Sequence, residues 1–203
     1  MKRIVALILA AVMVFSITAC GGEKTYTADD LAIRDIESGK IIRIGDTREE
    51  VEKIIGEPTD EEEYDKDNEN RFVSCSYRDG NDLILSIRYD KDDKIRNISL
   101  YGAEKEEAKY ELLPGVQTGS SYKDFLKAYP GSKEVFTSRV SLGPGRKSVG
   151  VLLKKNGDHY EICGEEESQE ANVFSNNYAY IVAVYDETSY IWSIDIENRP
   201  YQF

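Results

Sequence analysis

Alternation of apolar and polar residues with a period of two runs through most of this chain. In residues 83–89 every second side chain is apolar, which is typical of an antiparallel strand with one buried face. Runs of Asp, Asn and Gly separate such segments, as they do in hairpin turns. We expect strands at residues 71–77, 83–89, 94–101, 148–155, 158–163, 178–185 and 190–197.

Short helices are expected between these strands. The clearest begins at Thr47, which forms a capping box with Glu50 and precedes apolar residues at helical spacing. A second capped start combines Ser121 with Asp124. Two further helices are predicted over residues 27–39 and 103–112.

The pattern of residues 45–53 recurs 74 positions later, at residues 119–127. Gly, a hydroxyl cap, an acid, an apolar residue and a Lys align in both copies, and both are followed by strands. The sequence therefore predicts an α+β fold of two tandem helix–helix–antiparallel-sheet units, residues 27–102 and 103–203, with the helices on one sheet face. A single α+β domain with two chance helix starts is the alternative.

Residues 44–58, IGDTREEVEKIIGEP, resemble the signature of SmpA/OmlA-type small lipoproteins. They also resemble the repeated unit of the β-lactamase inhibitor proteins. The resemblance covers the first unit through about Tyr101, and the second unit only through residues 119–131 and the strand pattern. It implies short helices on one face of an antiparallel sheet, with the other face left for partners. It implies no shared catalytic residues.

The first twenty residues predict export and a lipid anchor. Lys2 and Arg3 precede an apolar run at 4–15, which is shorter than the roughly 20 residues of a spanning helix. The Ile-Thr-Ala-Cys sequence that ends at Cys20 resembles a bacterial lipobox, in which the cysteine thiol receives a diacylglycerol. An ordinary signal peptide is the alternative. We expect a signal peptide over 1–19, a lipidated linker over 20–26, and an extracytoplasmic location on the outer face of a Gram-positive-like cell membrane.

Acidic residues dominate the charge of the chain. It has 38 Asp and Glu against 26 Lys and Arg, for a net charge of −12. Such a surface is repelled by nucleic acids and by anionic lipid headgroups. The sequence therefore argues against nucleic-acid binding, predicts a body that stands off the membrane, and favours a basic protein partner.

No catalytic residue, metal site or cofactor site is predicted. The single histidine, His159, follows the turn signal Asn156-Gly157 and is expected to be a solvated hairpin residue. The acidic run at 65–69 does not match a calcium loop, because Asn70 and Ser76 occupy the positions that need Gly and Glu. An acid–base enzyme is the less favoured alternative.

Aromatic residues of the last two strands are the predicted partner-binding site. The period of two places Tyr190 and Trp192 on the same face as Ile194 and Ile196. That face is either core or an exposed patch suited to protein recognition. The candidate binding residues are Tyr178, Tyr180, Tyr190 and Trp192.

Two cysteines remain after Cys20, and both lie in strand-like segments. Cys75 and Cys163 can pair in a disulfide outside the membrane, or both can stay as buried free thiols.

Taken together, these features favour a membrane-anchored, non-catalytic protein-binding module. The first alternative is an inhibitor of a secreted or envelope hydrolase that inserts the loop at 60–70 or 164–177 into an active site. The second alternative is a structural lipoprotein of envelope assembly.

Overall fold

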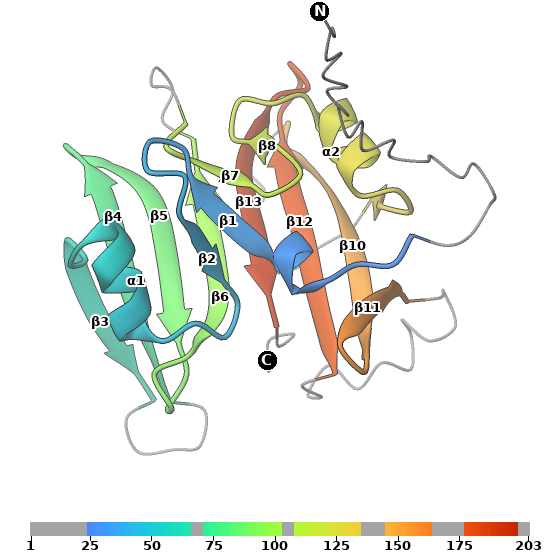
Figure 1. The fold of residues 1–203 in the computed structure, drawn as a ribbon. Coiled ribbons are helices and arrows are strands. Elements are labelled where there is room, and N and C mark those ends of the chain that lie inside the picture. The colour runs from blue at the N-terminus through green and yellow to red at the C-terminus, as the bar shows by residue number, and fades with distance from the viewer. Residues whose placement is uncertain (1–23, 66–70, 103–107, 135–144, 164–176, 199–203) are drawn as a thin grey trace, which may run out of the picture.

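A computed structural model describes residues 24–65, 71–102, 108–134, 145–163 and 177–198. In these residues the fold is mostly β-structure, arranged as two antiparallel sheets (Figure 1). The helices are short and lie between the strands along the chain.

The larger sheet contains nine strands in the described residues. They are β3 (Asp60–Tyr64), β4 (Phe72–Asp79), β5 (Asp82–Tyr89), β6 (Ile95–Tyr101), β9 (Lys133–Glu134), β10 (Lys147–Asn156), β11 (His159–Ile162), β12 (Tyr178–Tyr185) and β13 (Ile191–Glu197). Their order across the sheet is β11-β10-β12-β13-β6-β5-β4-β3, and β9 also pairs with β10.

A smaller sheet and the helices form a second layer. The smaller sheet has the order β2-β1-β7-β8, so strands from both halves of the chain meet in it. Its strands are β1 (Ala32–Asp35), β2 (Ile41–Arg43), β7 (Tyr110–Leu112) and β8 (Val116–Gln117). The helical segments are η1 (Ala28–Leu31, a 3-10 turn), α1 (Arg48–Ile55) and α2 (Tyr122–Ala128).

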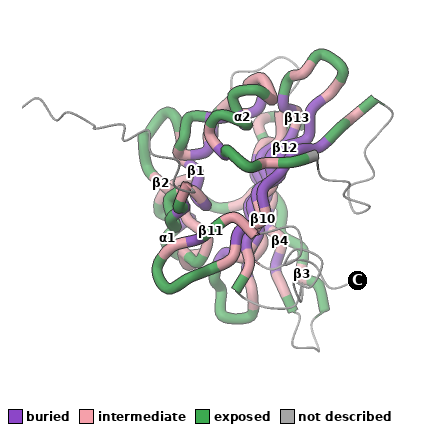
Figure 2. Tube along the Cα trace, turned by 90° about the vertical axis from the view of Figure 1, so that its right-hand side faces the viewer, coloured by how far each residue is buried: buried purple, intermediate pink, exposed green. Residues whose placement is uncertain are grey.

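The helices and the smaller sheet cover one face of the larger sheet (Figure 1). Val51 of α1, Phe125 of α2 and Tyr129 directly after α2 have no exposed surface. The ring of Tyr122 stacks on that of Tyr185 from β12, with centroids 4.8 Å apart. The buried residues concentrate where the two layers meet (Figure 2). Burial of each large apolar side chain in this layer contributes about 1.5–3 kcal/mol.

Both predicted capped helix starts are confirmed. The Thr47 hydroxyl accepts a hydrogen bond from the Glu50 backbone N–H, and the Glu50 carboxylate accepts one from the Thr47 N–H at 2.8 Å. The Ser121 hydroxyl accepts a bond from the Asp124 N–H at 3.3 Å. These bonds satisfy backbone donors that a helix N-terminus leaves unpaired.

The order strand, strand, helix, strands occurs twice along the chain. β1, β2 and α1 precede β3 to β6, while β7, β8 and α2 precede β9 to β13. Gly45 and Gly119 lead into the two helices with φ of +93° and +86°, a region that favours glycine. Because β6 pairs antiparallel with β13, both halves share one continuous sheet.

The predicted α+β architecture of two helix–helix–sheet units is wrong. The finding that overturns it is that strands occupy places where helices were expected. In residues 27–39 only a 3-10 turn forms before β1, and in residues 103–112 the strand β7 forms at Tyr110–Leu112. Residues 103–107 lie outside the described part. Ile33 of β1 pairs with Ile42 on one side and with Leu112 on the other, so long-range strand pairing overrides the local helical spacing.

The seven predicted strands are confirmed, with ends shifted by at most two residues. The acidic segment after residue 59, predicted as a loop, instead forms the edge strand β3. Arg48 pairs with Glu61 at 2.6 Å and Arg78 with Asp60 at 3.1 Å, which holds the charged edge in place. No helix in the described part of the chain is long and apolar enough to cross a bilayer.

Candidate functional site

The candidate site lies on the face of the larger sheet that points away from the helices, which we call the helix-free face. Ile98 of β6 pairs with Ile196 of β13, and both are fully buried toward the second layer. Their strand neighbours point the opposite way, because side chains alternate along a strand. The helix-free face includes Phe72, Arg88, Arg96, Asn97, Ser99, Tyr101, Tyr178, Tyr180, Trp192, Asp195 and Glu197.

A β-bulge at the start of β13 places Trp192 on this face. Val184 pairs with Ser193 but Tyr185 pairs with Ile191, so Trp192 is the extra residue. The indole packs edge-on against the ring of Tyr101, with centroids 6.2 Å apart. The prediction that Trp192 shares a face with Ile194 and Ile196 is therefore wrong, because the bulge changes the alternation.

A cation also contacts the Trp192 ring. The guanidinium of Arg146, just before β10, lies 3.9 Å from the indole centroid. A cation–π contact of this kind is worth about 0.5–1 kcal/mol at exposed sites and more when it is desolvated. Trp192 is therefore held by two neighbours while it remains partly exposed.

Tyr190 does not join Trp192. It precedes β13, lies opposite Ser121 at the start of α2, and is 57% exposed. The backbone of Ser189 beside it has φ of +68°, which marks the turn between β12 and β13. Of the four predicted aromatic residues, Tyr190 is thus the one that does not lie on the helix-free face.

Tyr178 and Tyr180 lie on the helix-free face of β12, and both are partly exposed. The Tyr180 hydroxyl donates a hydrogen bond to Glu197 Oε2 at 2.7 Å. Tyr180 pairs with Glu197, five residues along β13 from Trp192, so the two aromatic groups are roughly 16 Å apart.

A polar cluster that sequence reasoning missed lies between them. Ser99 Oγ is 2.5 Å from Asp195 Oδ1 and 3.2 Å from Asn97 Oδ1. The Asn97 side-chain amide donates to the Ile196 carbonyl at 3.2 Å. The cluster joins residues of β6 to residues of β13. The sequence does not show that these two strands pair, so it gives no sign that these residues are neighbours.

The electrostatics of the cluster favour neutral carboxyl groups. Glu197 has no exposed surface, and its burial raises the pKa to about 7 against the opposing effects of the Tyr180 hydroxyl, Arg96 and Arg88. Burial also raises the pKa of Asp195, against the hydrogen bond from Ser99 and the charge of Arg88. Among the residues that the structure describes, no hydrogen-bond donor reaches Glu197 Oε1. Glu197 can therefore gain or lose a proton near neutral pH.

A second aromatic group lies on the same face over β3 to β6. The guanidinium of Arg96 is 4.7 Å from the Phe72 centroid, and that of Arg88 is 5.5 Å away. Tyr64 stacks on Phe72 with centroids 4.7 Å apart. These residues come from four different strands, so only the folded sheet brings them together. Aromatic residues and arginine are the types most enriched at protein interfaces.

Cys75 and Cys163 are not joined by a disulfide in the structure. Cys75 is buried in β4, and burial raises the pKa of its thiol to about 11. Cys163 directly follows β11, and five strands of the sheet separate β11 from β4. A disulfide needs Cα atoms less than about 7 Å apart, so this fold excludes the pairing.

His159 lies in the predicted hairpin. It pairs with Asn156 across the β10–β11 turn, where Gly157 has φ of +66°. Its ring lies 3.1 Å from a Glu161 oxygen and 3.4 Å from an Asp158 oxygen, and these two acids raise its pKa. Among the described residues, no group of three His, Cys, Asp or Glu side chains could hold a metal ion.

Several predicted features lie outside the described residues. They are the signal peptide, Cys20, residues 66–70 of the acidic segment and residues 164–176 of the second loop.

Comparison of the chain with protein-family models, curated proteins and solved structures finds no match. The assignment of the lipoprotein family and of the β-lactamase inhibitor unit therefore stays a prediction that rests on residues 44–58.

Proposed function

We propose that this protein is a lipid-anchored, non-catalytic module that binds another protein of the cell envelope through its helix-free face. The observation that carries the proposal is the gathering of aromatic rings and arginines on that face. One group is Trp192 with Tyr101 and Arg146, and the other is Phe72 with its arginines. Side chains of these types supply most of the binding energy at interfaces.

Preorganisation supports the same proposal. A ring that is already held by its neighbours loses less conformational entropy when a partner binds. Trp192 is held by Tyr101 and Arg146, and Phe72 is held by Tyr64 and Arg96. The net charge of −12 would speed the approach of a basic partner.

The lipid at Cys20 would keep the protein near that partner. Each buried methylene of an acyl chain contributes about 0.8 kcal/mol, and two chains give a stable anchor where one does not. The lipobox at Ile17 to Cys20 is the sequence that supports this part of the proposal.

Photo-crosslinking from the helix-free face tests the proposed binding. A photo-reactive residue at Trp192 is expected to capture one specific protein in intact cells. The same residue at Ile36, which is 43% exposed in the other layer, is the control. Identical products from both positions, or no protein product from position 192, would contradict the proposal.

The captured protein then allows a measurement of affinity. Trp192→Ala is expected to weaken binding by about 2 kcal/mol or more, roughly 30-fold, because a central aromatic anchor is lost. Tyr190→Ala removes an aromatic residue of the β12–β13 turn and is expected to leave affinity nearly unchanged. Equal losses of affinity for Trp192→Ala and Tyr190→Ala would show that binding does not use the helix-free face.

A further inference from the structure

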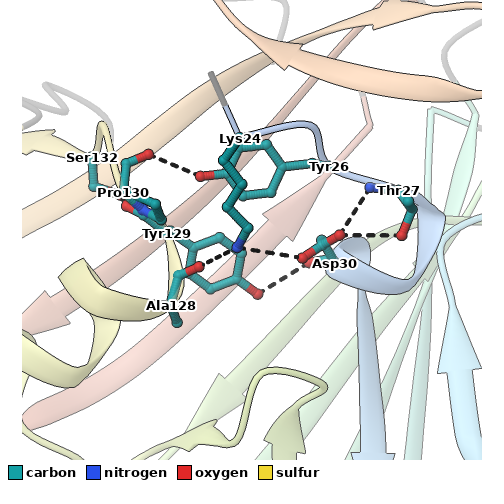
Figure 3. A network of polar contacts seen from close by, with 8 residues as sticks. All are labelled: Lys24, Tyr26, Thr27, Asp30, Ala128, Tyr129, Pro130 and Ser132. Carbon is teal, nitrogen blue, oxygen red and sulfur yellow. Dashed lines mark hydrogen bonds and ion pairs between the residues drawn. The ribbon is translucent and has the colours of Figure 1, made fainter. Parts of the chain in front are cut away.

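The chain enters the folded body at a fixed point beside α2. Lys24 Nζ donates a hydrogen bond to the Ala128 carbonyl at the end of α2 and lies 3.8 Å from Asp30 Oδ1 (Figure 3). The same nitrogen is 4.5 Å from the ring centroid of Tyr26 and 5.5 Å from that of Tyr129. A cation at a helix C-terminus is favourable because the last carbonyls carry partial negative charge.

The backbone next to Lys24 is fixed as well. Tyr26 exchanges two backbone hydrogen bonds with Tyr160 of β11, at 2.8 and 2.7 Å. Its hydroxyl donates to the Pro130 carbonyl at 2.9 Å, and the Tyr129 hydroxyl donates to the Asp30 carbonyl at 3.1 Å. The first described residues are therefore part of the body and do not act as a spacer.

This entry point limits how far the body can lie from a lipid on Cys20. Three residues separate Cys20 from Lys24, so an extended chain spans at most roughly 14 Å between them. A folded chain of this length has a radius of gyration of about 16 Å. Lys24, with α2 and β11 beside it, must then lie within roughly 14 Å of the lipid.

Exposed lysines lie near this entry point, although the chain as a whole is acidic and β11 also exposes Glu161, with Asp158 exposed beside it. Lys123, Lys127 and Lys133 are exposed, and Leu126 between them is 36% exposed. The acid on the exposed side of α2, Asp124, is bonded to the Ser121 hydroxyl and to Lys127.

The corresponding helix at the other end of the sheet has the opposite character. Glu49 and Glu50 of α1 are exposed, and Glu52 is partly exposed beside Arg48. Figure 1 shows α1 and α2 toward opposite ends of the larger sheet. The acidic strand β3 lies seven strand spacings from β11, roughly 34 Å across the sheet.

We propose that Lys123, Leu126, Lys127 and Lys133 form a surface that rests on the anionic bilayer and sets the orientation of the protein. This proposal rests on the lipidation of Cys20 in the proposed function. Lysines close to an anionic leaflet are attracted to it, and the effect acts only within about a Debye length. The larger sheet then stands away from the membrane with its β11 edge near the lipid and its acidic β3 edge outermost.

This orientation refines the expectation from net charge. The charge of −12 predicts repulsion between the whole body and anionic lipid. The acidic residues of α1 and β3 lie at the far end of the larger sheet, while the short tether brings the lysines near Lys24 to the membrane. The helix-free face is then directed along the membrane, where another envelope protein can reach it.

Two matched positions test the orientation. Lys127 and Lys53 occupy equivalent places in α2 and α1, with 78% and 67% of their side chains exposed. Lys127→Cys and Lys53→Cys, each in a Cys163→Ser background, receive the same fluorophore in the lipidated protein. The proteins are reconstituted in phosphatidylcholine–phosphatidylglycerol vesicles that carry nitroxide headgroups. We expect quenching at position 127 to exceed that at position 53 at least threefold.

Equal quenching at the two positions, or stronger quenching at position 53, would overturn the orientation. Charge reversal by Lys123→Glu with Lys133→Glu is expected to reduce the ratio of quenching at position 127 to quenching at position 53, since it removes the attraction to the anionic lipid. The mass of the N-terminal peptide, which shows whether Cys20 is lipidated, distinguishes failure of the proposed anchor from failure of the proposed orientation. A diacylglycerol on Cys20 with equal quenching refutes only the orientation, whereas an unmodified Cys20 refutes the anchor and the orientation with it.

Discussion

Glu197 combines complete burial with an ionisable group. Its neighbour Tyr180 donates one hydrogen bond to the carboxyl group, and no donor from the described part of the chain reaches Oε1. An ionised carboxylate in this position loses its hydration without full compensation, which is why its pKa rises to about 7. At the scale of single residues, the helix-free face therefore contains a group whose charge changes near neutral pH.

The pH dependence of stability tests this property. The folded-state pKa of about 7 lies above the ordinary value of 4.5, so the neutral carboxyl favours the folded state. Its contribution is fully present below pH 4.5 and is lost as the pH rises to about 7. The difference in unfolding free energy between the wild type and Glu197→Gln is expected to fall by about 3 kcal/mol between pH 4 and pH 8.

Urea unfolding at pH 4, 6 and 8 measures this difference. Glu161→Gln is the control, because Asn156 and His159 lower the pKa of the exposed Glu161 carboxyl and give the opposite sign. A wild-type-to-variant difference that does not change with pH would show that Glu197 titrates normally.

At the scale of single elements, local hydrogen bonds define where the helices begin. The start of α1 has a reciprocal pair of bonds between Thr47 and Glu50, together with a glycine at positive φ two residues earlier. α1 has eight residues, and a helix this short is not stable in isolation. Its cap and its buried Val51 must therefore both contribute.

Loss of this cap is expected to destabilise the protein measurably. Thr47→Ala leaves the Glu50 N–H without its side-chain acceptor and is expected to cost about 1 kcal/mol of unfolding free energy. Lys53→Ala on the exposed side of the same helix is expected to change stability much less. Thermal or urea denaturation of both variants measures the difference, and equal effects would contradict the role of the cap.

Elements with a strong local signal were predicted well from sequence. The caps at Thr47 and Ser121 and the strand at 178–185 follow from short-range patterns. β1 and β7 were missed because their stability comes from pairing with each other across the chain, with Ile33 opposite Leu112. The candidate site was predicted only in part, since Trp192 depends on a bulge and the polar cluster depends on the partner strand.

At the scale of the whole molecule, the pairing of β6 with β13 joins the two halves. Five residue pairs connect these strands, and the pair of Ile98 and Ile196 has no exposed surface. The smaller sheet joins the halves a second time through β1 and β7. Such shared sheets favour one cooperative unit over two independent ones.

Cooperative unfolding is the expected consequence, and a cavity at the junction tests it. Ile196→Ala is expected to lower the unfolding free energy by about 2–5 kcal/mol, because the junction cannot collapse fully around the lost atoms. Ile36→Ala, at a 43% exposed position, is the control and is expected to change it by about 0.5 kcal/mol or less. Hydrogen exchange followed by mass spectrometry should then show protection falling together in β5 and β12, which lie on opposite sides of the junction. Loss of protection in β12 while β5 keeps its wild-type protection would mean that the halves unfold independently despite the shared sheet.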